Sequence, residues 1–249
     1  MRVDLVEGPA GSDPVLDVAM AHALLELVAS GQRPPVVRCY RPHPTVAFGR
    51  RDRFLEGFPD AAAEARRHGF APVIRGAGGR AAAYHQGCLI FDEVMPAGAS
   101  TPGIRERFAD DAGRQAEALH GLGVDARVGE VPGEYCPGES SVNARGRVKL
   151  IGAAERIVRG SWLHSSVVVV ESAGAIRLVL TDVYAALGLD WDPETTGAVA
   201  DEAPGVGLDD VRRALLDAYA ARYELVPASL GELERARAQE LLDRHRVDA

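Results

Sequence analysis

Apolar residues recur at helical spacing in six segments of the chain. The segment 15–30 follows Asp13 and Pro14, which together form a typical helix start, and Gly31 closes it. In 101–119 the apolar residues again fall on one face, and glycines follow directly. Helices are therefore predicted at 15–30, 59–68, 101–119, 174–189, 208–222 and 229–246.

Between these helices, short runs rich in β-branched and aromatic residues predict strands. They are VVRCY (36–40), TVAFG (45–49), APVIR (71–75), CLIFDEV (88–94), VDARV (124–128), the hairpin arm RVKLIGAAERIV (147–158) and HSSVVVVES (164–172). The last run is the most strongly β-branched and is expected to be a central strand. The order of elements predicts an α+β fold, in which a mixed β-sheet is flanked by helices and the C-terminal third is helical.

The stretch VIRGAGGRAAAYHQGCLIF (73–91) runs from one predicted strand through a glycine-rich turn into another. Gly76, Gly78 and Gly79 permit positive φ angles and let a ligand approach bare backbone. Arg75 before the turn and His85 after it add polar groups at the same place. Such a loop suits an anionic or elongated ligand, although a plain tight hairpin is the alternative.

Of the 28 lysine and arginine residues, only Lys149 is a lysine. Lysine is a compact point charge on a flexible stem and arginine is a planar fork, so a single ammonium indicates chemistry that a guanidinium cannot perform. A surface lysine left by chance is the alternative. The setting argues against chance, because Lys149 follows a turn at 145–147 and lies in an apolar strand that Gly152 interrupts.

Composition and motif absences narrow the function classes. A net charge of −8 leaves no basic stripe for a phosphate backbone, so no nucleic-acid partner is expected. Three widely spaced cysteines indicate neither a disulfide framework nor a zinc site, and no metal is expected. There is no P-loop, HExxH or GxSxG motif. Neither a signal core nor a run of ~18 apolar residues is present, so we expect a cytoplasmic protein without a membrane partner.

Several spaced motifs resemble the lipoate and biotin protein ligase superfamily, and its lipoyl branch in particular. RGAGGRAAAYH (75–85) is similar to Arg-Arg-x-Ser/Thr-Gly-Gly-Gly-x-Val-x-His, and GRVKLIGAA (146–154) to Gly-Arg-Lys-Ile-x-Gly-Ser-Ala with one residue inserted before the lysine. FGRRDR (48–53) is similar to the family's Gly-Arg-x-Gln segment. The resemblance implies a catalytic domain at 1–190, and we expect 191–249 to be a helical extension packed on the same domain.

The resemblance also implies the site. Lys149 is the expected catalytic lysine, and the implied substrate-binding residues are Arg75, Gly78, Gly79, His85, Gly152, His164 and Arg50. Arg50 belongs to a charged cluster at 50–53 that is either a solvated loop or the rim of an anion site. The loop departs from the motif at Gly76 and Arg80, which replace an arginine and a glycine. This change disfavours tight ATP binding unless Arg80 compensates.

Cys136 lies in the polar loop VPGEYCPGESS, 13 residues before Lys149. ATP-dependent ligases of the superfamily generally lack a cysteine here, whereas the transferases that form a thioester acyl-enzyme carry one a dozen or so residues before the lysine. The resemblance therefore implies that Cys136 is a nucleophile. Cys39 and Cys88 lie in apolar strands and are expected to be small buried hydrophobes.

Two activities follow from the resemblance. In a transferase, the Cys136 thiolate takes an octanoyl or lipoyl group from a thioester, Lys149 stabilises the oxyanion, and no cofactor is needed. In a ligase, ATP and magnesium activate lipoate or octanoate as an acyl-adenylate, and Cys136 is incidental. The shortness of the segment after residue 190 favours the transferase.

The implied acceptor in both cases is a lysine on a lipoyl carrier domain, either the glycine cleavage H protein or a 2-oxoacid dehydrogenase E2. An acyl carrier protein is an implied donor. Other classes remain open, namely a cysteine hydrolase that pairs Cys136 with His85 or His164, and a non-catalytic family member that binds a lipoylated partner. A biotin ligase fits less well, because its loop runs Gly-Arg-Gly-Arg-x-Gly before an aromatic residue.

Overall fold

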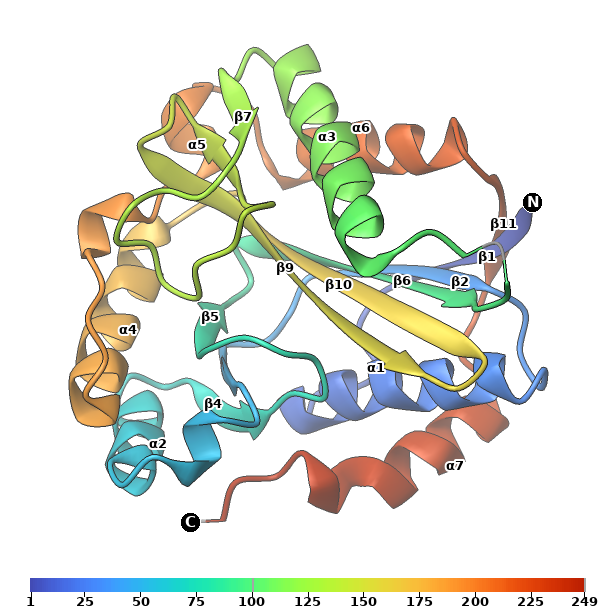
Figure 1. Ribbon diagram of the computed structural model, residues 1–249, viewed down its shortest axis with the longest axis horizontal. Helices are drawn as coiled ribbons and strands as arrows, with labels where there is room; N and C mark the ends of the chain where they lie inside the picture. Colours follow the sequence, from blue (N-terminus) through green and yellow to red (C-terminus); the bar gives the residue numbers. More distant parts are fainter. Residues whose placement is uncertain (100, 249) are drawn as a thin grey trace.

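The computed structural model describes residues 1–99 and 101–248 and contains a large mixed sheet and a small sheet with helices around them (Figure 1). The large sheet has the strand order β11-β1-β2-β6-β10-β9-β8-β7, and the small sheet has the order β4-β3-β5. The strands of the two sheets are β1 (Arg2–Glu7), β2 (Val36–Tyr40), β3 (Thr45–Phe48), β4 (Ala71–Ile74), β5 (Ala82–Tyr84), β6 (Cys88–Pro96), β7 (Ala126–Val128), β8 (Val142–Ala144), β9 (Val148–Val158), β10 (Ser161–Val169) and β11 (Glu224–Ala228). The α+β class predicted from the sequence is confirmed.

Helices cover both faces of the large sheet. Helices α3 and α6 lie on one face and α1 on the other, with α7 packed outside α1, while α2 and α4 lie beside the small sheet (Figure 1). The helices are α1 (Pro14–Ala29), α2 (Phe58–Arg67), α3 (Ile104–Gly121), α4 (Ala173–Leu187), α5 (Val199–Glu202), α6 (Leu208–Ala220) and α7 (Glu232–Leu241), with short 3-10 turns η1 (Asp52–Phe54), η2 (Pro193–Thr195) and η3 (Leu242–Arg244).

Helix α1 is buried on nearly all sides between the sheet and α7. Its start follows the expected chemistry, because the Asp13 side chain accepts a hydrogen bond from the Val15 N–H at 2.9 Å. Residues on every face of the helix are buried, including Met20, Leu24 and Leu25. A helix that is apolar all round belongs in a core, and α1 forms one wall of the interior beneath the sheet.

Strands β1 and β11, at one end of the large sheet, and β5 of the small sheet escaped the sequence analysis. Strand β1 pairs in parallel with β2 on one side and with β11 on the other. The C-terminal third is helical except for β11, whose Pro227 is compatible with the edge of a sheet. The segment predicted as one helix at 229–246 is the shorter α7 followed by η3. Within the described ranges, no helix combines the length and apolarity that a bilayer crossing requires.

The alternation of side chains along β10 divides its residues between the two faces of the large sheet. Ser166 accepts a hydrogen bond from Gln115 of α3 at 2.9 Å, so the even-numbered positions face α3. Leu163, Ser165 and Val167 line a cavity on the opposite face, next to α1. The consequence is that one strand contributes to two different environments.

Candidate active site

Predicted residues from three segments meet at one cavity. The segments are the glycine loop (residues 75–80), the cysteine loop (131–141) and the strand β9, which carries Lys149. The large sheet lines one side of this cavity, and α1 together with the small sheet lines the other. Arg75, Cys136, Lys149 and Gly152 lie in its wall. We call it the acyl cavity, after the use proposed for it below.

Cys136 is held in an unusual backbone conformation with its sulfur toward the glycine loop. Its φ angle is 44°, which is uncommon for a residue other than glycine. The Sγ atom lies 3.2 Å from the backbone nitrogen of Arg80 and 3.4 Å from Nη2 of Arg75, and both groups donate to it. The Cys136 N–H donates to the Tyr184 hydroxyl at 2.9 Å, which donates in turn to the Ala81 carbonyl oxygen. Tyr184 thus couples the cysteine loop to the glycine loop.

These contacts favour the thiolate form of Cys136. Burial by itself would raise the pKa of the thiol, but the guanidinium of Arg75 and the ammonium of Lys149 outweigh it and lower that pKa below its ordinary value. The other two cysteines behave in the opposite way, because burial raises the pKa of Cys39 and of Cys88 to about 12. Among the three, only Cys136 has the surroundings of a reactive nucleophile.

Lys149 is 2% exposed and has its three N–H groups directed at the cysteine loop. Nζ donates to Oε1 of Glu134 at 3.1 Å, to the Tyr135 carbonyl oxygen at 3.1 Å and to the Cys136 carbonyl oxygen at 2.9 Å. The ammonium also lies 4.8 Å from the centre of the Tyr135 ring. Lys149 therefore fixes the backbone that carries the cysteine, and its charge lies close to the sulfur.

Glu134 is a central residue of this loop that the sequence analysis missed. Its carboxylate accepts from the Val131 N–H, the Gly138 N–H and the Ser141 hydroxyl, in addition to Lys149. A buried carboxylate is tolerated when it is paired and hydrogen-bonded in this way. The only signal in the sequence is an acidic residue two positions before the cysteine, and nothing local shows that it turns inward.

Two of the predicted glycines are required by close approach. A Cβ added to Gly79, whose φ is +97°, would lie 2.5 Å from Nη2 of Arg75 and 2.7 Å from Sγ of Cys136. A Cβ added to Gly152 would lie 2.8 Å from Cε of Lys149. These distances are shorter than real contacts, so the glycines make room for the groups around the sulfur.

Arg50 lies at the outer side of the glycine loop. Arg50 and Arg51 line a shallow depression together with residues 76–80, which include Gly78. Arg80 is tied to this region because its Nη1 lies 3.1 Å from Oδ1 of the buried Asp52. Arg50 and Arg51 are exposed, so this arrangement fits the rim of an anion site and a solvated loop alike.

Two predicted binding residues lie outside this group. His85 has backbone partners on both ring nitrogens, because Nδ1 accepts from the Gly87 N–H at 2.9 Å and Nε2 lies 3.2 Å from the Ser172 carbonyl oxygen. His164 lies on the opposite face of the sheet, where Nε2 is 3.0 Å from Oδ2 of Asp111. Neither histidine lines the acyl cavity, so the structure does not bring them to Cys136.

A second, open groove reaches Cys136 from the other side. Its walls are the first turns of α3, with Ile104 and Phe108, and the loop 136–141. The groove measures about 760 Å³ and shares Cys136, Lys149, Ala153 and Ala154 with the acyl cavity. The sulfur therefore lies where an enclosed cavity and an open groove meet.

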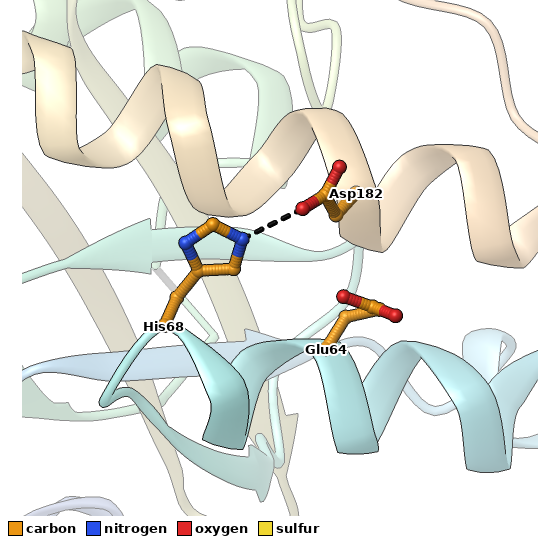
Figure 2. Close-up of side chains that lie close together, drawn as sticks. All are labelled: Glu64, His68 and Asp182. Atoms are coloured by element: carbon orange, nitrogen blue, oxygen red, sulfur yellow. Dashed lines mark hydrogen bonds and ion pairs between the residues drawn. The ribbon is translucent and has the colours of Figure 1, made fainter.

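A group of possible metal ligands lies away from this site, between α2 and α4. His68, directly after α2, points at Asp182 of α4, with Nε2 2.7 Å from Oδ2, and Glu64 lies beside them (Figure 2). Arg67 pairs with both carboxylates, through a short contact to Glu64 and at 3.5 Å from Asp182. The carboxylates already have a cationic partner, so this cluster is accounted for as an ion pair between helices.

Comparison with known proteins identifies the family of the chain. Residues 13–219 match the family model described as the lipoyl protein ligase A/B catalytic domain. The chain is similar to two proteins named octanoyl-[GcvH]:protein N-octanoyltransferase. The one from Geobacillus kaustophilus is 30% identical over 76% of this chain and 66% of its own length, and the one from Exiguobacterium sibiricum is 33% identical over 60% and 55%. The chain thus spans between about half and two thirds of these relatives.

Solved structures show the same fold. A bipartite lipoate protein ligase from Thermoplasma acidophilum superposes with a TM-score of 0.73 at 23% identity, covering 98% of this chain and 92% of the other. LipL1 of P. falciparum, solved with lipoate, superposes with a TM-score of 0.70 at 10% identity, covering 97% and 70%. The family match extends over most of the chain and includes the glycine loop, Cys136 and Lys149. The chain therefore belongs to the lipoyl protein ligase A/B catalytic domain family.

Proposed function

We propose that the protein transfers an octanoyl or lipoyl group to the lysine of a lipoyl carrier domain through a thioester on Cys136. One observation carries the proposal, namely the activated sulfur of Cys136 between the Arg75 guanidinium and the Arg80 N–H at the mouth of a cavity. The names of the relatives support it, since they describe transfer of octanoyl from GcvH to a protein.

The chemistry proceeds in two balanced steps. The Cys136 thiolate attacks the acyl carbonyl carbon and the bond from that carbon to the donor breaks. The donor atom (the sulfur of a thioester or the nitrogen of an amide) leaves with a proton taken up from solvent. The neutral ε-amine of the acceptor lysine then attacks the thioester, the carbon–sulfur bond breaks, and the amine proton is released as the thiolate is restored. Covalent catalysis divides one difficult step into two easier ones.

The groups around the sulfur supply the electrostatics of both steps. Arg75 and the Arg80 N–H are the nearest donors to Sγ, so they are the groups best placed to stabilise a tetrahedral oxyanion. Lys149 directs all three of its N–H groups at protein acceptors, so its proposed role is to hold the loop and keep the sulfur ionised. This assigns oxyanion binding to Arg75 and Arg80 ahead of Lys149.

The two cavities provide separate routes for the two reactants. The acyl cavity lies between the sheet, α1 and the small sheet, and its wall includes apolar side chains such as Leu163 and Val167, which suit an acyl chain. The open groove along α3 exposes apolar side chains such as Ile104 and leads to the same sulfur. In the proposal, the carrier arm of the donor and then the acceptor lysine enter through this groove.

The test measures whether an acceptor protein gains the mass of an acyl group. The protein is incubated with an apo E2 lipoyl domain and either octanoylated H protein or octanoyl acyl carrier protein, and a parallel reaction contains free octanoate or lipoate with ATP and magnesium. We expect an octanoyl gain without ATP that Cys136→Ser abolishes and Cys88→Ala retains, because Cys88 is a buried core thiol. The two donors distinguish an H-protein source from an acyl-carrier source.

An ATP-dependent ligase is the second candidate. The depression formed by Arg50, Arg51 and the glycine loop favours it, since arginine side chains suit a nucleotide phosphate. The same experiment separates the two. A gain that requires ATP and is equally large in Cys136→Ser would establish the ligase and reject the transferase.

A further inference from the structure

The far end of the acyl cavity is polar. Across the large sheet, Ala154 of β9, Ser165 of β10, Asp92 of β6 and Arg38 of β2 form one row of paired positions. The first three members of this row line the cavity. An acyl chain that enters beside Cys136 and runs across the strands therefore meets a carboxyl group.

Asp92 is 1% exposed and only half satisfied by its neighbours. Its Oδ1 accepts from the Ser165 hydroxyl at 2.6 Å. Its Oδ2 lies 3.6 Å from Nη1 of Arg38, beyond hydrogen-bond distance, and has no hydrogen-bond partner within the part of the chain that the structure describes. One oxygen of a buried carboxyl group thus remains available to the cavity.

Arg38 does not donate a hydrogen bond to Oδ2 of Asp92, because its guanidinium binds Asp17 instead. Its guanidinium makes a short contact with Oδ1 of Asp17, donates to the Asp17 carbonyl oxygen at 3.2 Å and lies 3.9 Å from the centre of the Tyr40 ring. Two buried carboxyl groups therefore share one guanidinium. Burial raises the pKa of Asp92, and this shift is consistent with a carboxyl group that can either donate or accept a hydrogen bond.

The position of Asp92 matches the length of the proposed cargo. Strand β6 is the second strand beyond β9, so the row places Asp92 about 10 Å across the sheet from β9. An extended eight-carbon acyl chain has a comparable length. The distal atom of the chain, and not its middle, would therefore lie next to Asp92.

An apolar chain end would leave this carboxyl oxygen buried and unpaired, which is costly, whereas a hydroxyl or thiol would pair with it. We propose that the protein selects medium-length acyl groups that carry a hydrogen-bonding group at the distal end, and that Asp92 with Ser165 determines this preference over plain octanoyl. The inference rests on the proposed function, because it takes Cys136 as the head of the cavity.

The test measures binding separately from transfer. Calorimetric titrations of the Cys136→Ala protein with octanoate and with 8-hydroxyoctanoate compare ligands that differ only at the distal carbon. We expect the hydroxylated acid to bind about tenfold more tightly, the scale of one hydrogen bond to a buried polar group. Adding Asp92→Leu should remove the preference or reverse it, while adding Asp92→Asn, which keeps a hydrogen-bonding group, should retain it.

The matched control is Ser166→Ala, on the same strand but on the opposite face, and it should leave the preference unchanged. If octanoate binds Cys136→Ala as tightly as 8-hydroxyoctanoate, or if neither acid binds, the inference is overturned. Acyl transfer by the parent protein is measured independently, so octanoyl transfer through Cys136 combined with no binding preference would reject the inference and keep the proposed function.

Discussion

The two faces of the large sheet differ in how they surround polar groups, as two neighbouring residues of β10 show. His164 faces α3 and lies within ion-pair distance of Asp111 and Glu155, in a cluster that also contains the Arg107–Glu155 pair. Ser165 faces the acyl cavity and donates to Asp92, whose second oxygen has no hydrogen-bond partner in the described structure. Both faces bury charge and hold polar atoms without a hydrogen-bond partner among the described residues, but only the groups around Ser165 line a cavity that reaches Cys136.

The difference teaches how to separate a structural polar cluster from a functional one. On the α3 face, the ionisable groups pair with one another and leave only a small cavity of about 10 Å³ between them. On the cavity face, small residues such as Gly152, Ala153 and Ala154 keep the space empty, and charges from other loops surround a reactive sulfur. A perturbed pKa occurs on both faces, so the pKa alone does not identify the site.

Removing the lysine charge on the cavity face should have the largest effect. Lys149→Met deletes the ammonium that holds the Tyr135 and Cys136 carbonyls and helps to keep the thiol ionised, so the rate of acyl transfer should fall by about 100-fold or more. Steady-state transfer assays would measure this. The control is Arg147→Met, two residues earlier and exposed, which should keep the parent rate. A near-normal rate for Lys149→Met would remove the lysine from the mechanism.

On the α3 face, the main effect should be on stability and its pH dependence. Burial alone would lower the pKa of His164, but the pairing with Asp111 and Glu155 outweighs it and raises that pKa to about 9. The stabilisation is then complete below the unfolded pKa of about 6.5 and is lost as the pH rises through 9, a change of roughly 3 kcal/mol in the free energy of unfolding.

Urea titrations at pH 6 and pH 10, on the parent and on His164→Asn, test this expectation. The parent should lose stability between the two pH values, and the variant should lose much less. If the free energy of unfolding depends on pH as strongly in His164→Asn as in the parent, groups other than His164 control the pH dependence.

Adding one methyl group to the glycine loop should have a smaller effect than deleting the lysine. In Gly79→Ala the new Cβ meets Sγ of Cys136 and Nη2 of Arg75, and the φ of +97° disfavours alanine. We expect about a tenfold loss in the rate at which iodoacetamide alkylates Cys136. Gly78→Ala has open space around its Cβ and is the matched control, with an alkylation rate close to the parent's.

The smallest effect is expected for Ser166→Ala. It removes the hydroxyl that accepts a hydrogen bond from Gln115 on the α3 face of the sheet. The free energy of unfolding should therefore fall by about 1 kcal/mol while acyl transfer stays unchanged. Chemical unfolding and the transfer assay check the two parts. A clear loss of transfer would show that the two faces are coupled.

Local patterns predicted most of the elements but not the two strands β1 and β11 at one end of the large sheet. The helices at α1, α3 and α4 and the strands β6 and β10 follow from spacing and β-branching within one segment. Strand β11 pairs with β1, although the two sequences are more than 200 residues apart, and β1 pairs with β2 on its other side. A pairing over that separation leaves no periodic mark in either segment.

The candidate site likewise contains residues that local motifs predict and residues whose position depends on distant parts of the chain. Arg75, Gly79, Cys136 and Lys149 were predicted from motifs and are brought together, whereas His164 was predicted from a motif and faces the other side of the sheet. The face of a strand depends on its register, which the hydrophobic pattern of a buried strand does not reveal. Glu134 was missed for a related reason, since its inward turn depends on Lys149 being opposite.

The central claim is that Cys136 carries the acyl group. Its most direct test is intact-protein mass spectrometry after incubation with the octanoyl thioester of N-acetylcysteamine, followed by peptide mapping. The account predicts one octanoyl adduct on Cys136 that hydroxylamine removes and that is absent from Cys136→Ser. An adduct on another residue, or none on a protein that still modifies the acceptor lysine with ATP, would contradict it.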